Sequence, residues 1–298
     1  MELKELFDGN CYHICTNGNN TPILLRDKED YKVVCNYLAI FTWKLKIQML
    51  AYIIMSNHLH MIIVCTNREQ AESFTRVLKQ NIASYLRHKY GIEKCFKSVD
   101  HCISIIDSCK YLRNCIAYVL RNAICAKICN RIEDYPWSSY SAYFSFSNTE
   151  TAIRRMSQLS FRERRKILKT RDEYYDAPLY VDSSGRIIND CFVRNDIVER
   201  AYYNSGRHFL TCLGTCNDAD IEYALAIKPL IKVDDMNLMD TVNRVVSDRF
   251  NGKQLSNLTN TDKCKIIKNL YFNNKTSVSQ LSRVLGLPKD LISQILST

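Results

Sequence analysis

Residues 47–65 read IQMLAYIIMSNHLHMIIVC, two apolar segments separated by Ser56 and Asn57. Each segment has the length and the β-branched content of a strand, and the Ser-Asn pair between them predicts a hairpin turn. His58 and His60 interrupt the second segment. Because strand side chains alternate between the faces of a sheet, both imidazoles point the same way. The stretch therefore predicts a β-hairpin with two histidines on one face.

Strands and helices alternate around this hairpin. Residues 11–18 (CYHICTNG) alternate like a strand and end in a turn cluster. Apolar residues recur at helical spacing in three stretches, 29–46, 69–90 and 107–130. Asp27 and Asp30 are possible caps for the first helix, and Gly91 ends the second. This order predicts an α+β domain in which helices cover one face of an antiparallel sheet.

The composition changes after residue 146. We expect a first domain over 1–146, a charged connecting region over 147–216 and a helical C-terminal domain over 217–298. The connecting region includes FRERRKILKTRDE, which suits either a solvated helix or one that contacts phosphates.

The chain ends in the outline of a helix-turn-helix over about 276–298. One helix ends at Gly286, and a second opens with Pro288 at its first position. The second helix would present Lys289, Ser293 and Gln294 to DNA. The alternative is a helical hairpin that only packs.

The overall charge points to an anionic partner. The chain of 298 residues has a formal net charge of +10, and such a surplus attracts polyanions, most commonly nucleic acid. The N-terminal MELKELFDGN lacks the apolar region of a signal peptide, and no apolar run approaches the ~18 residues of a membrane span. We therefore expect a soluble, cytoplasmic protein.

The fourteen cysteines include no CxxC pair. Scattered through predicted helices and strands, they indicate reduced and mostly buried thiols. Cys125 with Cys129 and Cys212 with Cys216 each share a helix face, but zinc would need two further ligands that the sequence does not identify.

The histidine pair is a candidate cation site. A lone strand histidine is usually a core residue with satisfied hydrogen bonds, whereas two imidazoles on one face can converge on one metal ion. The third predicted helix contains AYVLRNAI, in which Tyr118 and Asn122 stand four residues apart on one face. They are either ordinary packing residues or a nucleophile with a neutral oxygen ligand.

The motifs YHI, AYIIMSNHLHMII, YLRNCIAYVLRNAI and DYPWSSY follow one another in this order. In this the chain resembles the HUH-superfamily single-tyrosine transposases, most closely the REP-associated tyrosine transposases (RAYT), over roughly residues 8–145. The resemblance implies an HUH nuclease fold with a ferredoxin-like antiparallel sheet. It assigns His58, His60 and Asn122 as ligands of Mg²⁺ or Mn²⁺, and Tyr118 as the nucleophile.

The implied reaction is cleavage and rejoining of single-stranded or hairpin DNA through a 5′-phosphotyrosine. Free tyrosine, with a pKa near ~10, is a poor nucleophile until its phenolate is favoured. The covalent intermediate keeps the energy of the phosphodiester, so no ATP is needed, in agreement with the lack of a GxxxxGK[ST] motif. Some relatives are homodimers, and the sequence leaves a homodimer open here.

The chain departs from the family pattern in three places. Ser56-Asn57 replaces the usual Pro-Asn, and Asn122-Ala123 replaces a frequent Asn-Pro. The glycine-rich stretch between the second and third helices is shortened to GIEKCFKSVDHC. These differences concern the shape of the DNA channel more than the chemistry.

Basic residues around the second helix are candidate phosphate contacts, with a solvated surface as the alternative for each: Lys79, Arg87, Lys89, Lys94 and Lys97.

Other functions and other nucleophiles stay open at this point. The chain could be a DNA-binding regulator with an inactive transposase-like domain, or an HUH replication initiator. Tyr85, Tyr90 and Tyr111 compete with Tyr118 for the nucleophile role, and Tyr111 lies near the same helix face.

Overall fold

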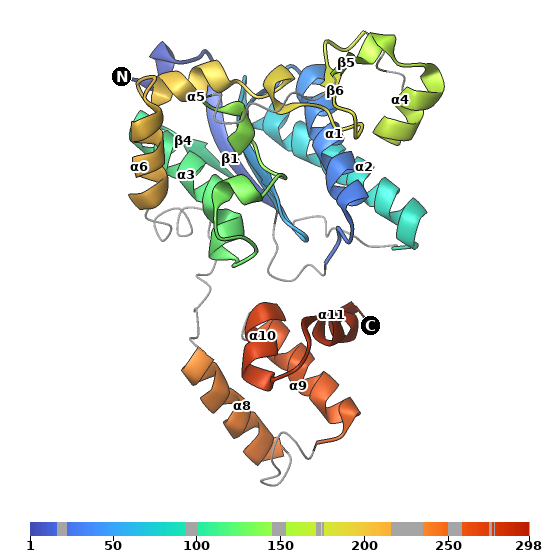
Figure 1. Cartoon of the computed structure of the whole chain (residues 1–298). Helices are drawn as coiled ribbons and strands as arrows, with labels where there is room; N and C mark the ends of the chain where they lie inside the picture. The colour runs from blue at the N-terminus through green and yellow to red at the C-terminus, as the bar shows by residue number, and fades with distance from the viewer. Residues whose placement is uncertain are drawn as a thin grey trace. The chain divides into compact units, whose positions relative to one another are not determined.

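The computed structural model describes residues 1–16, 23–92, 101–144, 153–170, 174, 176–215, 235–249, 258–273, 276 and 278–297. The predicted contacts Lys94 and Lys97 lie outside these residues. The chain divides into two compact units, Met1–Ile227 and Lys228–Thr298 (Figure 1). The predicted boundaries at 146/147 and 216/217 stay predictions.

A four-stranded antiparallel sheet forms the centre of the first unit. Its strands lie in the order β2-β3-β1-β4, and the chain order is β1-α1-β2-β3-α2-β4, which is the ferredoxin-like arrangement. The bounds are β1 Asn10–Thr16, α1 Lys28–Lys44, β2 Gln48–Ile54, β3 Leu59–Cys65, α2 Arg68–Tyr90, β4 His101–Ile106 and α3 Cys109–Cys125.

The predicted hairpin is confirmed. β2 and β3 pair antiparallel, and at the turn the Met55 N–H donates to the His58 carbonyl at 2.8 Å. The predicted helix boundaries also agree at two ends: α1 begins at a capping box of Asp27 and Asp30, and α2 ends at Gly91 with φ of +68°.

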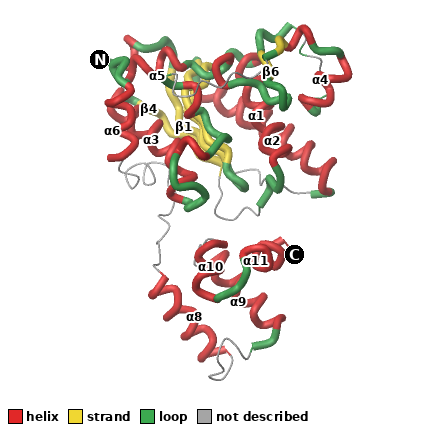
Figure 2. The backbone as a smooth tube through the Cα atoms, viewed as in Figure 1, coloured by secondary structure: helices red, strands yellow, loops and turns green. Residues whose placement is uncertain are grey.

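The prediction that helices cover one face of the sheet is wrong. All seven residues of β3 are buried, and so are the last six of β1 and of β2, which requires cover on both faces. α1 and α2 pack together on one side, and α3 packs against β2 and β3 on the other (Figure 2). The nearly continuous apolar runs of these strands are the physical reason.

Residues 153–170, 174 and 176–215 add to the same core. Met156, Leu168, Ile197 and Phe209 are buried in it, although we expected a charged connecting region. The elements here are β5 Arg154–Arg155, α4 Phe161–Leu168, β6 Tyr180–Val181, α5 Asn195–Ala201 and α6 Gly206–Thr215. Short 3-10 helices cover Leu3–Glu5, Ile132–Asp134, Tyr140–Ala142, Met156–Gln158 and Asn189–Cys191.

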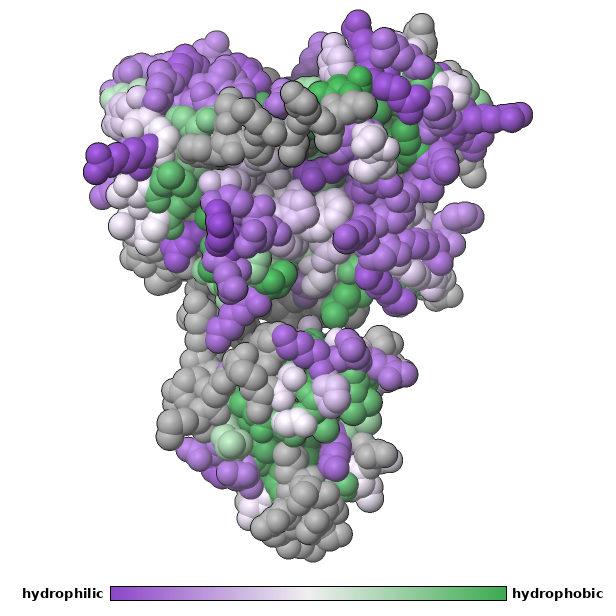
Figure 3. All heavy atoms as spheres, in the orientation of Figure 1, coloured by the Kyte–Doolittle hydropathy of each residue, from purple (hydrophilic) through white to green (hydrophobic). Residues whose placement is uncertain are grey.

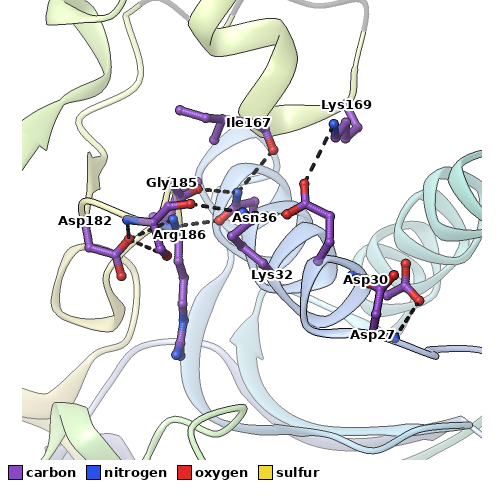
Figure 4. A network of polar contacts seen from close by, with 12 residues as sticks. Asp27, Asp30, Lys32, Asn36, Ile167, Lys169, Asp182, Gly185 and Arg186 are labelled. Atoms are coloured by element: carbon purple, nitrogen blue, oxygen red, sulfur yellow. Dashed lines mark hydrogen bonds and ion pairs between the residues drawn. The ribbon is translucent and has the colours of Figure 1, made fainter.

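A buried amide ties this region to α1. The Asn36 side chain donates to the carbonyls of Ile167, at 3.3 Å, and Gly185, at 3.0 Å, and accepts from the Ile187 N–H at 2.8 Å (Figure 4). Gly185 has φ of +83°, a conformation that favours glycine. One side chain thus satisfies three backbone groups from two segments.

The surface around α2 and α4 is largely hydrophilic. In Figure 3, hydrophilic side chains cover most of the visible surface around α2 and α4. Arg162, Arg165 and Lys166 are exposed on α4, which leaves both interpretations of this charged helix open.

The second unit is helical where the structure describes it. Its helices are α8 Asp235–Arg249, α9 Asn260–Asn273, α10 Val278–Leu285 and α11 Lys289–Ser297. Buried apolar side chains such as Leu238, Ile267, Leu281 and Ile292 form a separate core. A turn at Gly286, φ +64°, joins α10 to α11, which begins one residue after the predicted Pro288.

No described helix is both long and apolar enough to cross a membrane.

Candidate active site

Two central strands and one helix bring the histidines and Tyr118 together. β1 and β3 are neighbours, with Cys15 opposite His60 and His13 opposite Ile62. Residues 13, 15 and 60 therefore share one face of the sheet, and α3 covers that face.

The site is a cluster of four rings. The centroids of His58 and His60 are 5.1 Å apart, and that of Tyr118 is 5.4 Å from His60. His13 completes the cluster, at 5.5 Å from His60 and 5.9 Å from Tyr118. His13 and His60 are buried, and Tyr118 is 7% exposed. Three of the four predicted site residues thus lie in direct contact.

A neighbouring amide fixes the tautomer of His58. Its Nδ1 lies 2.8 Å from Oδ1 of Asn57, which can only accept, so the Nδ1–H donates. The lone pair of His58 is then on Nε2. The Asn of the Ser-Asn turn thereby gives His58 the hydrogen bond that usually orients a metal-binding histidine.

His60 has a neighbour at each ring nitrogen. Its Nδ1 lies 3.3 Å from Nε2 of His13, and its Nε2 lies 3.7 Å from Sγ of Cys15. The Cys15 thiol also donates to the Thr16 carbonyl at 3.3 Å. Burial raises the pKa of this thiol, so it stays protonated and is a poor competitor for a cation.

Burial keeps the imidazoles neutral. It lowers the pKa of His13 to about 3 and that of His58 to about 4. Burial, and then the nearby charges that His58 and His13 would carry, lower the pKa of His60 well below its usual value. Neutral imidazole is the form that binds a metal ion.

Asn122 lies one helical turn after Tyr118 and is half-buried. Its amide nitrogen donates to the Tyr118 carbonyl at 2.9 Å, which leaves its oxygen as the atom open to another group. Within the described chain, no group of three His, Cys, Asp or Glu side chains is placed to hold a metal ion. An oxygen from Asn122 is therefore needed by the predicted site, and its role as a ligand stays a prediction.

Two competing tyrosines have other partners. The hydroxyls of Tyr85 and Tyr90 donate to Asp30 of α1, at 2.8 and 2.9 Å. Burial, and next the Cys115 thiol, raise the pKa of Tyr111. Tyr118 is the tyrosine whose ring contacts His60 and His13.

The basic residues of α2 differ in their surroundings. Lys79 is buried at 9% exposure, and Lys89 forms ion pairs with Asp27 at 2.7 Å and Asp30 at 2.6 Å. Both features favour a structural role for these two lysines. Arg87 is exposed and suits a phosphate contact better.

The predicted DNA contacts of the second unit lie on α11. Lys289 and Gln294 are exposed there, and Ser293 is half-buried. Their contact with DNA stays a prediction.

The cysteine pairs gain no support as zinc sites. Cys125 and Cys129 belong to no metal-binding group among the described residues, and Cys216 lies outside those residues.

His13 was not among the site residues predicted from the sequence. Its motif YHI contributed to the resemblance, but nothing local in the sequence indicates that the first strand pairs with the histidine strand. That pairing, and the register that sets Cys15 against His60, place the His13 ring beside His60.

Comparison with known proteins gives one weak similarity. No family model matches the chain, and no curated protein matches it. A solved structure of a REP-associated tyrosine transposase bound to a REP hairpin is 15% identical, with a TM-score of 0.39. The match covers 47% of this chain and 82% of the other. Values this low do not assign the chain to a family.

Proposed function

We propose that this protein is an HUH-type tyrosine transposase or endonuclease that cleaves and rejoins single-stranded or hairpin DNA. The observation that carries the proposal is the ring cluster on one covered face of the sheet. The ring centroid of Tyr118 lies 5.4 Å from that of His60, and the centroid of His60 lies 5.1 Å from that of His58. A tyrosine beside two neutral imidazoles combines a nucleophile with metal ligands in one site. The family resemblance of the sequence supports the same assignment.

The residues fit a divalent cation in chemical terms. Nδ1 of His58 and the amide nitrogen of Asn122 form hydrogen bonds within the protein, which leaves Nε2 of His58 and the amide oxygen of Asn122 to bind the ion. His60 is neutral and can also bind. His58, His60 and Asn122 would hold the ion. Mg²⁺ or Mn²⁺ bound there would act as a Lewis acid on the non-bridging phosphate oxygens.

Tyr118 performs the covalent step. Its hydroxyl oxygen attacks phosphorus, the 3′-oxygen of the neighbouring nucleotide leaves and takes a proton, and a 5′-phosphotyrosine forms. A 3′-hydroxyl then attacks this ester, which restores a phosphodiester and frees the tyrosine. Each step breaks one phosphodiester linkage and forms another, so the reaction needs no nucleotide cofactor.

Packing of the tyrosine ring supports this role. Tyr118 is nearly buried between His13 and His60, so its ring has little freedom to turn. An attacking group held in one orientation loses less entropy on reaching the transition state.

The net charge of +10 supports DNA as the partner. Exposed Arg87 on α2 and Lys289 and Gln294 on α11 are the residues we propose for contacts with it. A homodimer is compatible with this function, and the chemistry does not require one.

A cleavage assay on a labelled hairpin oligonucleotide tests the proposal. In Mg²⁺ or Mn²⁺ we expect a cleaved product and a covalent adduct that resists denaturing gel electrophoresis. Tyr118→Phe should lower cleavage at least about 10³-fold, because phenylalanine has no nucleophilic oxygen. Tyr111→Phe is the matched control on the same helix, and it should retain cleavage.

DNA binding without cleavage in either metal would contradict the proposal. It would favour a DNA-binding regulator with an inactive catalytic domain.

A further inference from the structure

His13 is a buried residue with an incomplete set of hydrogen bonds. Its exposed fraction is 0%, and its Nε2 lies 3.3 Å from Nδ1 of His60. Its Nδ1 has no hydrogen-bond partner among the described residues. An imidazole nitrogen buried without a partner costs free energy, so packing alone does not account for a histidine at this position.

The proton positions follow from the needs of the site. A cation bound at Nε2 of His60 requires the ring proton of His60 to be on Nδ1. The atom facing that proton is Nε2 of His13. His13 must then accept the hydrogen bond and carry its own proton on Nδ1, where it has no partner among the described residues.

We propose that His13 is a positioning residue for His60: it accepts the Nδ1–H of His60 and so directs Nε2 of His60 to the cation. This inference rests on the proposed function, because the cation belongs to that function. His58 has the equivalent arrangement, since its Nδ1–H donates to Asn57. Both histidines of the pair thus have a partner for Nδ1.

His13 also packs against the nucleophile. Its ring is 5.9 Å from that of Tyr118, with an interplanar angle of 67°, and 5.5 Å from that of His60. One buried ring therefore packs against both the tyrosine and the metal-binding histidine. Hydrogen bonds to metal-binding histidines commonly contribute 10–100-fold to metal affinity.

Direct metal binding to the full chain without DNA tests the inference. We would measure Mn²⁺ affinity by calorimetry for the wild type, His13→Phe and His13→Gln. His13→Phe keeps a ring in the core and removes the acceptor, so Mn²⁺ affinity should fall about 10–100-fold. Its melting temperature should stay close to that of the wild type, because the unpaired Nδ1 of His13 is removed while Nδ1 of His60 loses its partner.

Two variants separate positioning from packing. The amide oxygen of His13→Gln can accept the same hydrogen bond, so this variant should recover part of the affinity. Tyr12→Phe removes a hydroxyl from the neighbouring residue of β1, on the opposite face of the sheet, and should bind Mn²⁺ like the wild type.

Nuclear magnetic resonance measures the position of the ring proton directly. In ¹H–¹⁵N spectra with Mg²⁺ bound, His60 should be protonated at Nδ1.

Three results would overturn the inference. If His13→Phe binds Mn²⁺ as tightly as the wild type, or if Mg²⁺-loaded His60 is protonated at Nε2, His13 has no positioning role and the proposed function stands. If the wild type binds neither ion at millimolar concentration, this inference and the proposed metal site fail together.

Discussion

At the scale of single residues, the site combines burial with neutrality. Folded-state pKa values of about 3 for His13 and about 4 for His58 lie well below the value near 6.5 of an unfolded chain. The folded protein thus keeps uncharged imidazoles at neutral pH. The same burial makes its stability depend on pH.

We expect the free energy of unfolding of the metal-free chain to fall as the pH drops from about 6.5 to about 4. In this window the unfolded chain binds protons on histidine and the folded chain does not, so each buried histidine costs about 1.4 kcal/mol per pH unit. His13→Phe should make the slope shallower by that amount. Urea unfolding at several pH values, in EDTA, measures it.

The control is His88→Gln, since His88 is exposed on α2. It should leave the slope unchanged. A slope that is the same in the wild type and in His13→Phe would show that His13 is not held neutral.

Residue spacing indicated the two halves of this cluster, and the family resemblance joined them. Two histidines with strand spacing, and a tyrosine and an asparagine with helix spacing, indicate which side chains share a face. His58, His60 and Tyr118 do lie together. His13 could not be predicted, because its place depends on the register between strands 47 residues apart in the chain.

At the scale of elements, polar side chains fix how segments join. Asp30 is fully buried at the start of α1 and accepts hydrogen bonds from Tyr85, Lys89 and Tyr90 of α2. Asn36 performs the same task between α1, the end of α4 and the turn at Gly185. Both are polar residues of α1 that the helical pattern of the sequence does not distinguish from surface positions.

Asn36→Ala should lower the free energy of unfolding by about 2–4 kcal/mol. The substitution leaves the Gly185 carbonyl and the Ile187 N–H buried without their partner, and each such group costs roughly 1–3 kcal/mol. Denaturant unfolding at pH 7 measures the change.

Asn81→Ala is the matched control, because the Asn81 side chain donates to the Val77 carbonyl within its own helix. It should cost less than about 1 kcal/mol. Equal losses in the two variants would show that Asn36 does not anchor the region after α4.

The arrangement of elements was predictable in part. Helix and strand order follows from periodicity and caps, and Asp27, Asp30 and Gly91 act as predicted. The second covered face was not predicted, because α3 was assigned from its helical spacing, which does not indicate which strands it covers. The nearly continuous apolar runs of β2 and β3 did contain that signal.

At the scale of the whole molecule, two units each have their own core. The first contains the ring cluster, and the second presents α11. Sequence composition indicated a helical C-terminal part, and the structure describes α8 to α11 there.

Lys289→Ala should reduce the salt dependence of DNA binding. A lysine that contacts a phosphate releases about one counterion, so the slope of log affinity against log salt concentration should become shallower by about 0.7–0.9. Fluorescence anisotropy on a hairpin oligonucleotide at several salt concentrations measures the slope. An unchanged slope would exclude Lys289 from the DNA interface.

The central claim is that Tyr118 is the nucleophile beside His58 and His60. Mass spectrometry of the peptide that stays linked to DNA after cleavage of a hairpin oligonucleotide tests it most directly. We expect one linked peptide, from α3, with the phosphate on Tyr118. A link to Tyr111, or to any tyrosine outside the ring cluster, would contradict it.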